Sequence, residues 1–480
     1  MRRNILPITL LLAGVMLLAS CLGDDDDSGN ITYYGDSAIT SFSLGTLNRT
    51  YLYNNGDTIK KTYEQDVDST TTVDASTYTL TIDQLKGEIY NVDSLPAGTD
   101  ISKVVCSVAS KNSGVVVIKR LTSDTLDYYT SSDSLDFRQP REFRVYSTDG
   151  TGYRKYTVEL RVHKELPDSF TWSRQTIMDI TSFGAKGVKT VQMGDKMYSL
   201  VAGVNTVILS KDINGNSPWK QLGSNLNRVF SDEAYRNVAV LDGWMYLLDG
   251  GQLLKSQDGQ NWSQIDVQNI SNLKRLVGAS SRKLYALTSA GIASSADGEN
   301  WTEASMDGNT AMLPTGSISL CVLPSKTNKD VERVLMIGNS ANADTAAVVW
   351  GKIEDAGETV DSYSWSLYEG TEKKRLPDMQ GLSVMRYDGK LFAIGGAGMN
   401  GSNASPFDGI YCSTDQGLTW NLCTSLSLPT DFSRDASPLA VSMAADSYNN
   451  VWLVDAAQAQ VWKMRVNRLG WKEEQRAFNE

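Results

Sequence analysis

The chain has 480 residues, enough for two or three domains, and its 56 acidic against 45 basic side chains give a formal net charge of −11. This acidic balance disfavours nucleic acid as a partner, because binding to phosphates requires a cationic surface. The single histidine, His163, has no second histidine to form a metal pair, and its place in the first part of the chain argues against Ser-His-Asp or Cys-His catalysis in the large C-terminal part. The five cysteines contain no Cys-x-x-Cys pair, so we expect no metal and no other cofactor.

The first 20 residues have the pattern of a secretory signal. Arg2 and Arg3 precede an apolar run over residues 5–18, which is shorter than the roughly 20 residues of a membrane-spanning helix. The run ends in Leu18-Ala19-Ser20-Cys21, which resembles the lipobox of bacterial lipoproteins. The resemblance implies cleavage before Cys21 and lipid attached to it, so that the lipid anchor is the chain's one expected membrane contact. The alternative is an ordinary signal peptide followed by an incidental cysteine.

Residues 21–30 form an acidic tether that contains four consecutive aspartates, Asp24 to Asp27. An acidic run just after the lipid-bearing cysteine resembles the surface-export signal of Bacteroidota lipoproteins. This implies an outer-membrane lipoprotein exposed on the cell surface. The alternatives are a merely solvated tether, since like charges extend a chain, and a position facing the periplasm.

Residues 31–164 are predicted to form a β-sandwich, because short alternating runs are separated by Gly, Asp and Ser. The segment 155–162 alternates apolar and polar residues cleanly. The ending Tyr146-Ser147-Thr148-Asp149-Gly150 with Tyr156-Thr157-Val158 resembles Ig-like domains of Bacteroidota surface lipoproteins, which act chiefly as spacers. Residues 165–168 are predicted to be a linker, because Pro167 removes a backbone donor and breaks strand pairing.

Residues 169–480 contain a repeat, strand–tight turn–strand, which recurs six times and predicts a six-bladed β-propeller in an all-β protein. A seventh blade would be present if one degenerate copy has been overlooked. A strand near Trp172 resembles the outer strands of the repeat and is expected to complete the last blade. The recurring turns lie at residues 194–195, 242–243, 281–282, 388–389 and 449–450, with a weaker copy at 333–338.

A second repeated motif is a hairpin with an acidic turn. It resembles the Asp-box, Ser-x-Asp-x-Gly-x-Thr-Trp, of sialidase-like propellers, fully at residues 413–420 and one residue shorter in two other copies. The aspartates are predicted to bond their own turn, the glycines to supply positive φ, and the tryptophans to cover the hairpin, which makes the motif structural. Its residues are Ser256, Asp258, Gly259, Trp262, Ser295, Asp297, Gly298, Trp301, Ser413, Asp415, Gly417 and Trp420.

Cys412 and Cys423 flank this last hairpin. They either pair across it as a disulfide or remain two small thiols in the packed interior. Four thiols beyond Cys21 cannot cross-link some 450 residues, so the fold must be stabilised mainly by burial.

The candidate binding residues lie in the long loops of the propeller face opposite the acidic turns, where propellers usually carry function around their central channel. Asp232 and Arg236 end one connection between blades, Arg434 and Asp435 hold the corresponding place in another, and Phe407 is an aromatic residue in a third loop. These residues would suit a sugar or a carboxylate; the alternative is that they are solvated loop residues.

The whole chain resembles Bacteroidota lipoproteins of unknown function with an Ig-like domain followed by a propeller. We therefore expect a non-catalytic surface protein whose propeller binds a glycan or an outer-membrane protein partner. The alternative is a polysaccharide-active glycoside hydrolase or lyase that uses carboxylates at the channel mouth. The sialidase Arg-Ile-Pro segment is absent from the sequence, as are the two histidines that copper-radical oxidases would need in the propeller.

Overall fold

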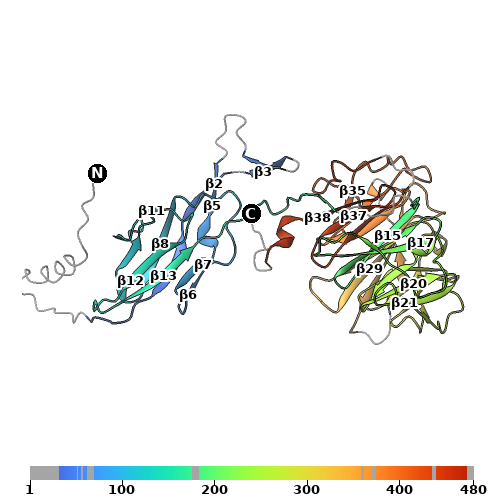
Figure 1. Cartoon of the computed structure of the whole chain (residues 1–480), viewed down its shortest axis with the longest axis horizontal. Coiled ribbons are helices and arrows are strands. Elements are labelled where there is room, and N and C mark those ends of the chain that lie inside the picture. Colours follow the sequence, from blue (N-terminus) through green and yellow to red (C-terminus); the bar gives the residue numbers. More distant parts are fainter. Residues whose placement is uncertain are drawn as a thin grey trace, which may run out of the picture. The chain divides into compact units, whose positions relative to one another are not determined.

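The computed structural model describes residues 32–50, 52–55, 58–61, 70–175, 183–357, 362–369, 374–434 and 439–472. Cys21, the acidic tether and Asp435 lie outside the described residues. The chain divides into two compact units, and the main division falls between Lys164 and Glu165. Strands dominate both units, as the labels in Figure 1 show. Within the described part of the chain, no helix is both long and apolar enough to cross a membrane.

The N-terminal unit consists of two main sheets that enclose one core. The apolar residues of its strands alternate with exposed ones, as in β1 and β8, which places one face of each sheet inside. The three-stranded sheet has the order β1 (Ile39–Leu44), β8 (Val104–Ser110), β11 (Ser134–Leu135). The six-stranded sheet has the order β10 (Leu126–Tyr128), β9 (Val116–Lys119), β12 (Arg141–Tyr146), β13 (Tyr153–Glu159), β7 (Glu88–Asn91), β6 (Leu80–Asp83).

Pairing within these sheets is antiparallel except between β13 and β7, which run parallel. One further pair and two short 3-10 helices complete the unit: β2 (Thr46–Thr50) with β5 (Thr70–Asp74), η1 (Ala75–Thr77) and η2 (Lys111–Ser113). The strands β3 (Leu52–Asn55) and β4 (Thr58–Lys61) form a separate pair, between β2 and β5 in the sequence. The core is aromatic at its centre, where Phe42 meets Phe143 edge to face at 5.5 Å between ring centroids.

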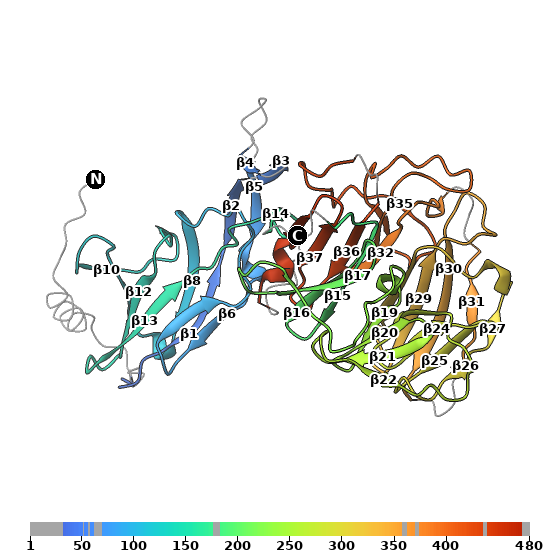
Figure 2. The same cartoon turned by 45° about the vertical axis from the view of Figure 1, so that its right-hand side comes forward.

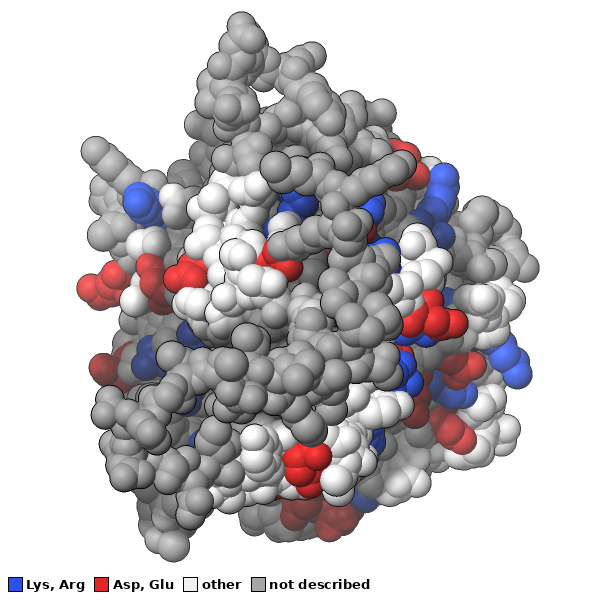
Figure 3. Space-filling view, turned by 90° about the vertical axis from the view of Figure 1, so that its left-hand side faces the viewer, with Lys and Arg blue, Asp and Glu red and all other residues white. Residues whose placement is uncertain are grey.

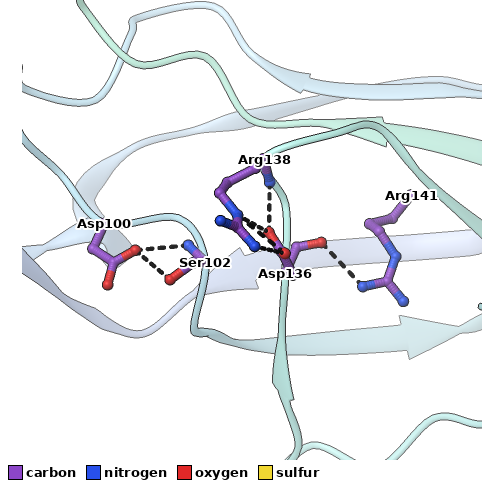
Figure 4. A network of polar contacts seen from close by, with 5 residues as sticks. All are labelled: Asp100, Ser102, Asp136, Arg138 and Arg141. Carbon is purple, nitrogen blue, oxygen red and sulfur yellow. Dashed lines mark hydrogen bonds and ion pairs between the residues drawn. The ribbon is translucent and has the colours of Figure 1, made fainter. Parts of the chain in front are cut away.

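A polar network holds two loops of this unit together (Figure 4). The Asp100 carboxylate accepts hydrogen bonds from the backbone N–H and hydroxyl of Ser102, and Arg138 donates to the Asp136 carboxylate through its backbone N–H, Nε and Nη2. The backbone N–H of Phe137 donates to the carbonyl of Ile101 at 2.8 Å and so ties one loop to the other. The Arg138 side chain is largely exposed, so its ion pair adds little, and the network acts mainly by fixing Phe137 in the core.

Lys, Arg, Asp and Glu are interspersed on the described surface that faces the viewer in Figure 3. Such mixing is typical of a solvated protein face.

Counted over the described residues, the C-terminal unit contains six sheets, each with four antiparallel strands, which are sequential in five of the sheets. Five of them are β15 (Gly187–Met193) to β18 (Lys220–Gln221), β19 (Val238–Leu241) to β22 (Ser263–Ile265), β23 (Arg275–Ala279) to β26 (Thr302–Glu303), β28 (Ile318–Pro324) to β31 (Trp365–Leu367), and β32 (Ser383–Tyr387) to β35 (Asn421–Leu422). The sixth consists of β36 (Val441–Ala445), β37 (Val451–Asp455), β38 (Gln460–Met464) and β14 (Ser173–Arg174).

The middle strands of these sheets are β16 (Lys196–Ala202), β17 (Thr206–Asp212), β20 (Trp244–Asp249), β21 (Gln252–Ser256), β24 (Leu284–Leu287), β25 (Ile292–Ser295), β29 (Val331–Gly338), β30 (Val348–Asp355), β33 (Lys390–Ile394) and β34 (Tyr411–Ser413). Outside this scheme are β27 (Met306–Asp307), which pairs parallel with β31, and the short helices η3 (Ala234–Arg236), η4 (Thr310–Met312) and η6 (Asn467–Gly470).

The first strand of each sheet contacts the first strand of the next, in the cyclic order β15, β19, β23, β28, β32, β36 and back to β15. Figure 2 shows several of these inner strands side by side. This is the arrangement of a β-propeller. Its ring is closed by β14, which comes from the start of the unit and pairs with β38 through Ser173–Lys463 and Arg174–Trp462. The strand expected near Trp172 therefore lies one residue further along and completes the last sheet.

Apolar clusters between neighbouring sheets hold the ring together, and tryptophan is central to them. Trp219 of the first sheet meets Trp452 of the last edge to face, with ring centroids 6.1 Å apart. Trp365 meets Tyr285 of the preceding sheet in the same way at 5.3 Å. The sheets are thus sealed by large aromatic surfaces, whose burial is the main stabilising term for such a ring.

Candidate functional site

The acidic turns are bonded within themselves. The Asp297 carboxylate accepts from the backbone N–H groups of Glu299 and Asn300 at 2.8 Å, and the Ser295 hydroxyl accepts from the N–H of Gly298 at 2.9 Å. Bonds to Asn300 and the two N–H groups lower the pKa of the Asp297 carboxyl against a smaller opposing effect of burial. The turns around Asp258 and Asp415 have equivalent bonds. All of these carboxylates are occupied by their own turns.

The tryptophan of each acidic turn anchors it to the glycine of the turn. The indole Nε1 of Trp301 donates to the carbonyl of Gly298 at 2.8 Å, and Trp262 and Trp420 bond their glycines similarly. Gly298 has φ +82°, and a Cβ there would lie 2.8 Å from the ring of Tyr246 in the preceding sheet. Glycine is required because the turn needs both a left-handed conformation and close approach to that ring.

A cavity of about 350 Å³ lies within the ring of the propeller, lined by all six inner strands. This volume is near the lower end for small-molecule sites. The charged side chains among the described lining residues are Lys189, Arg236, Arg275 and Arg386, all of them cations. Arg236 precedes β19 and Arg275 begins β23, so both lie at the end of the cavity where the long connections enter. Arg386 is next to the last residue of β32 and lies toward the other end.

Lys189 connects three inner strands. It is the third residue of β15, and its Nζ donates to the carbonyl oxygens of Arg236, Val238 and Val277 at 3.4, 3.1 and 3.2 Å. Three acceptors match the three N–H bonds of an ammonium group. Burial, together with the nearby charge of Arg275, lowers the pKa of Lys189 to about 7.

Arg275 is held by the next connection of the ring. Its Nη1 donates to the carbonyl oxygens of Thr315 and Gly316 at 2.9 and 2.5 Å. Burial, followed by the charge of Arg236, lowers the pKa of Arg275 to about 10, which still leaves it fully charged at neutral pH. Its guanidinium group is therefore a fixed positive charge in the wall of the cavity.

Arg236 and Tyr235 form a pair at the cavity mouth. The Nε of Arg236 donates to the Tyr235 hydroxyl at 2.7 Å, and its Nη1 lies 3.0 Å from a carboxylate oxygen of Glu233. The Arg236 side chain is 40% exposed. Tyr235 can lie against β15 because residue 187 is glycine, where a Cβ would approach the phenol ring to 2.3 Å.

The remaining inner strands are connected by serine hydroxyls. Ser319 accepts from the N–H of Val384, Ser383 from that of Met443, and Ser442 from that of Thr190, at 3.0–3.1 Å. These bonds satisfy backbone groups at three successive junctions, while Lys189 and Arg275 satisfy carbonyls at the others. The wall of the cavity is thereby fixed before any ligand arrives.

The structure separates the residues that the sequence placed in one pocket. Arg236 lines the cavity, whereas Asp232 and Arg434 are exposed on their connections, and Asp435 is not among the described residues. The interpretation of Phe407 as an exposed aromatic for sugar stacking is wrong. Phe407 is only 2% exposed and packs against Phe432 at 5.1 Å between ring centroids, because the long loop folds over the core.

Sequence reasoning missed Lys189, Tyr235, Arg275 and Arg386. The available signal was a charged residue inside an otherwise apolar first strand of the repeat, as with Lys189 between Val188 and Thr190. A charge at such a position must either face the channel or be paired within the sheet.

Two buried glutamates lie outside the cavity. Glu332 and Glu354 are cross-strand partners on β29 and β30. Burial raises the pKa of Glu354, although Tyr285 and Ser280 donate hydrogen bonds to its carboxylate.

Cys412 and Cys423 are free thiols, and burial and the nearby Cys423 raise the pKa of Cys412 to about 11. The described residues contain no group of three or more His, Cys, Asp or Glu side chains that could hold a metal ion.

No protein with a curated description matches the chain. Solved structures that resemble it include a protein of unknown function from Bacteroides thetaiotaomicron (11% identity, 81% of this chain and 98% of that one, TM-score 0.38). They also include the Penicillium chrysogenum α-L-arabinanase in complex with arabinobiose (10%, 62% and 99%, TM-score 0.36) and the lectin SapL1 in complex with α-methyl fucoside (11%, 57% and 89%, TM-score 0.33).

Two family models match the chain itself. Residues 166–474 match the DUF6242 beta propeller domain, and residues 42–160 match the N-terminal domain of the same family, a domain of unknown function. The expected propeller in an all-β protein is confirmed. The chain belongs to the DUF6242 family.

Proposed function

We propose that this protein is a lipid-anchored lipoprotein, displayed on the outer-membrane surface, whose six-bladed propeller binds a glycan without catalysis. The motif ending in Cys21 and the acidic run after it support the anchor and its location. The N-terminal unit, an Ig-like sandwich in this proposal, acts as the spacer. The six four-stranded sheets and the cyclic contacts of their inner strands support the number of blades.

The observation that carries the binding function is the open end of the axial cavity. Tyr235, Arg236 and Arg275 place a phenol and two guanidinium groups there, on a wall held by backbone hydrogen bonds. Hydroxyl and guanidinium groups are suitable partners for the hydroxyls and oxygen anions of sugars. Hydrolysis with the usual pair of carboxylates would need acidic side chains in this place, where the described lining has cations and hydroxyls, so binding is the favoured activity.

The anchor is tested by labelling cells that express the full chain with a fatty-acid analogue. We expect the wild type to incorporate label and to be degraded by protease added to intact cells. The Cys21→Ala variant is expected to incorporate none, because the thiol that accepts lipid is gone. Labelling of the variant would contradict lipidation at Cys21, and complete protection of the wild type would contradict surface display.

Binding is tested on an array of neutral and acidic glycans with purified full-length protein in detergent. We expect retention of the wild type on a subset of glycans and loss of that retention in Tyr235→Ala, which removes a side chain at the cavity mouth. The matched control is Tyr128→Ala, an exposed tyrosine of the N-terminal unit. If no glycan retains the wild type, or if the control loses binding equally, glycan recognition by the cavity is wrong.

A further inference from the structure

Three basic side chains line one end of the axial cavity. Lys189, Arg236 and Arg275 come from three successive inner strands or the turns before them, and all three line the same space. Among the described residues, the one ion pair that any of them makes is that of Arg236 with Glu233. We infer that this end of the cavity binds a short acidic saccharide by placing its carboxylate or sulfate group between Arg236 and Arg275. The inference rests on the proposed glycan-binding function and specifies its ligand class.

The hydrogen-bonding capacity of the two arginines supports this assignment. Among the described residues, the Arg275 side chain bonds only two carbonyl oxygens, both through Nη1, so its Nε and Nη2 donors remain available. Arg236 uses Nε for Tyr235 and Nη1 for Glu233, which leaves Nη2. Guanidinium groups bind carboxylate and sulfate oxygens with short, charge-assisted hydrogen bonds.

The electrostatics of the cavity point the same way. Arg236 and Lys189 are each close enough to Arg275 for like charges to repel, and Glu233 balances only part of this charge. An anionic group between the arginines would relieve that repulsion, whereas a neutral ligand would not. The carbonyl bonds of Lys189 and Arg275 hold the charges in place when no ligand is bound.

The size of the cavity and the charge of the whole protein limit the ligand further. A cavity of about 350 Å³ holds a small group rather than a polymer. The net charge of −11 repels long polyanions at a distance. A short acidic saccharide, or the acidic end of a longer chain, satisfies both conditions.

The first experiment compares matched saccharides on one array: uronic acids, sulfated sugars and their neutral counterparts, probed with the full-length wild type. We expect acidic members to be bound and their neutral counterparts to be bound at least about tenfold more weakly, because a charged hydrogen bond is lost. Preference for uronic acids or for sulfated sugars tells which anion the site takes. Preference for neutral sugars would overturn the inference and leave the proposed function standing, and absence of all binding would overturn both.

The second experiment measures the affinity of the best acidic binder by calorimetry with Arg236→Gln and Arg275→Gln. We expect each substitution to weaken binding about tenfold or more. Arg120→Gln is the matched control, since Arg120 is 41% exposed and, like Arg236, forms an ion pair with a carboxylate. Because the Arg236 side chain is partly exposed, we expect Arg236→Gln to fold. This variant decides the outcome if Arg275→Gln fails to fold. Unchanged affinity in Arg236→Gln, or an equal loss in Arg120→Gln, would overturn the assignment.

Discussion

Replacing Trp301 with alanine is expected to lower the free energy of unfolding of the propeller by about 3–5 kcal/mol, the cost typical of deleting a buried tryptophan. Trp301 is 1% exposed and packs in one cluster with Tyr246, Leu248 and Ile265 of the preceding sheet. Its indole N–H also anchors the turn at Gly298. The substitution therefore opens a junction between two sheets and removes a buried hydrogen bond at the same position.

Thermal and urea unfolding of the full chain measure this effect. For a unit of this size we expect the unfolding midpoint of the propeller transition to fall by roughly 6–20 °C, from about 2–4 °C per kcal/mol. Trp301→Phe should recover part of the loss, because most of the aromatic contact returns while the indole hydrogen bond does not. Tyr448→Ala serves as the control, since Tyr448 is an exposed aromatic residue at a tight turn of the same unit. Equal shifts for Trp301→Ala and Tyr448→Ala would contradict a special role of the junction.

The parts of the fold that could be predicted are those encoded within short segments. The turn at Asp258 is specified by residues within a few positions of each other, and its hydrogen bonds connect Ser256, Asp258 and Asn261. Copies of such a segment at a regular interval are sufficient to predict a ring of similar sheets. The strand that closes the ring was predictable for the same reason, since it repeats the outer strands of the other sheets.

The site was less predictable because its residues meet only after the ring closes. The Lys189 ammonium bonds the carbonyl of Val277, which is 88 residues away in sequence. No local pattern places these two groups together. The prediction for Phe407 was wrong for a different reason. The length of its loop and the position of that loop in the repeat suggested an exposed segment. The loop instead carries Phe407 and Ile410 back into the core, where they pack with Phe432.

Lys189→Met is expected to change the pH dependence of stability rather than the fold, since methionine keeps an unbranched side chain of similar length. Between pH 7 and 10.5 the folded chain holds Lys189 largely neutral, because its pKa is lowered from 10.5 to about 7, whereas the unfolded chain protonates it. Unfolding then takes up a proton, so the wild-type free energy of unfolding rises with pH in this window. The full difference corresponds to about 5 kcal/mol, and solvent screening in the open cavity reduces it to on the order of 2 kcal/mol.

Urea unfolding of wild type and Lys189→Met at pH 6.5 and 9.5 isolates this effect, because the tyrosines and the other cations titrate alike in both chains. We expect the free energy of unfolding of the wild type to rise relative to that of Lys189→Met as the pH rises from 6.5 to 9.5. A constant difference would mean that Lys189 keeps an ordinary pKa in the folded state.

Protonation of Lys189 is also expected to affect the binding of an anionic ligand in the cavity. The charged groups that face Lys189 from the neighbouring elements are Arg236 and Arg275, with Arg386 further along the channel. A bound anion favours the protonated lysine and raises its pKa, so binding takes up a proton near neutral pH. The affinity for an acidic saccharide should therefore fall between pH 6 and pH 8 in the wild type and stay flat in Lys189→Met. If the affinity is independent of pH in both chains, Lys189 only connects the inner strands. Arg236 and Arg275 then bind the anion without its help.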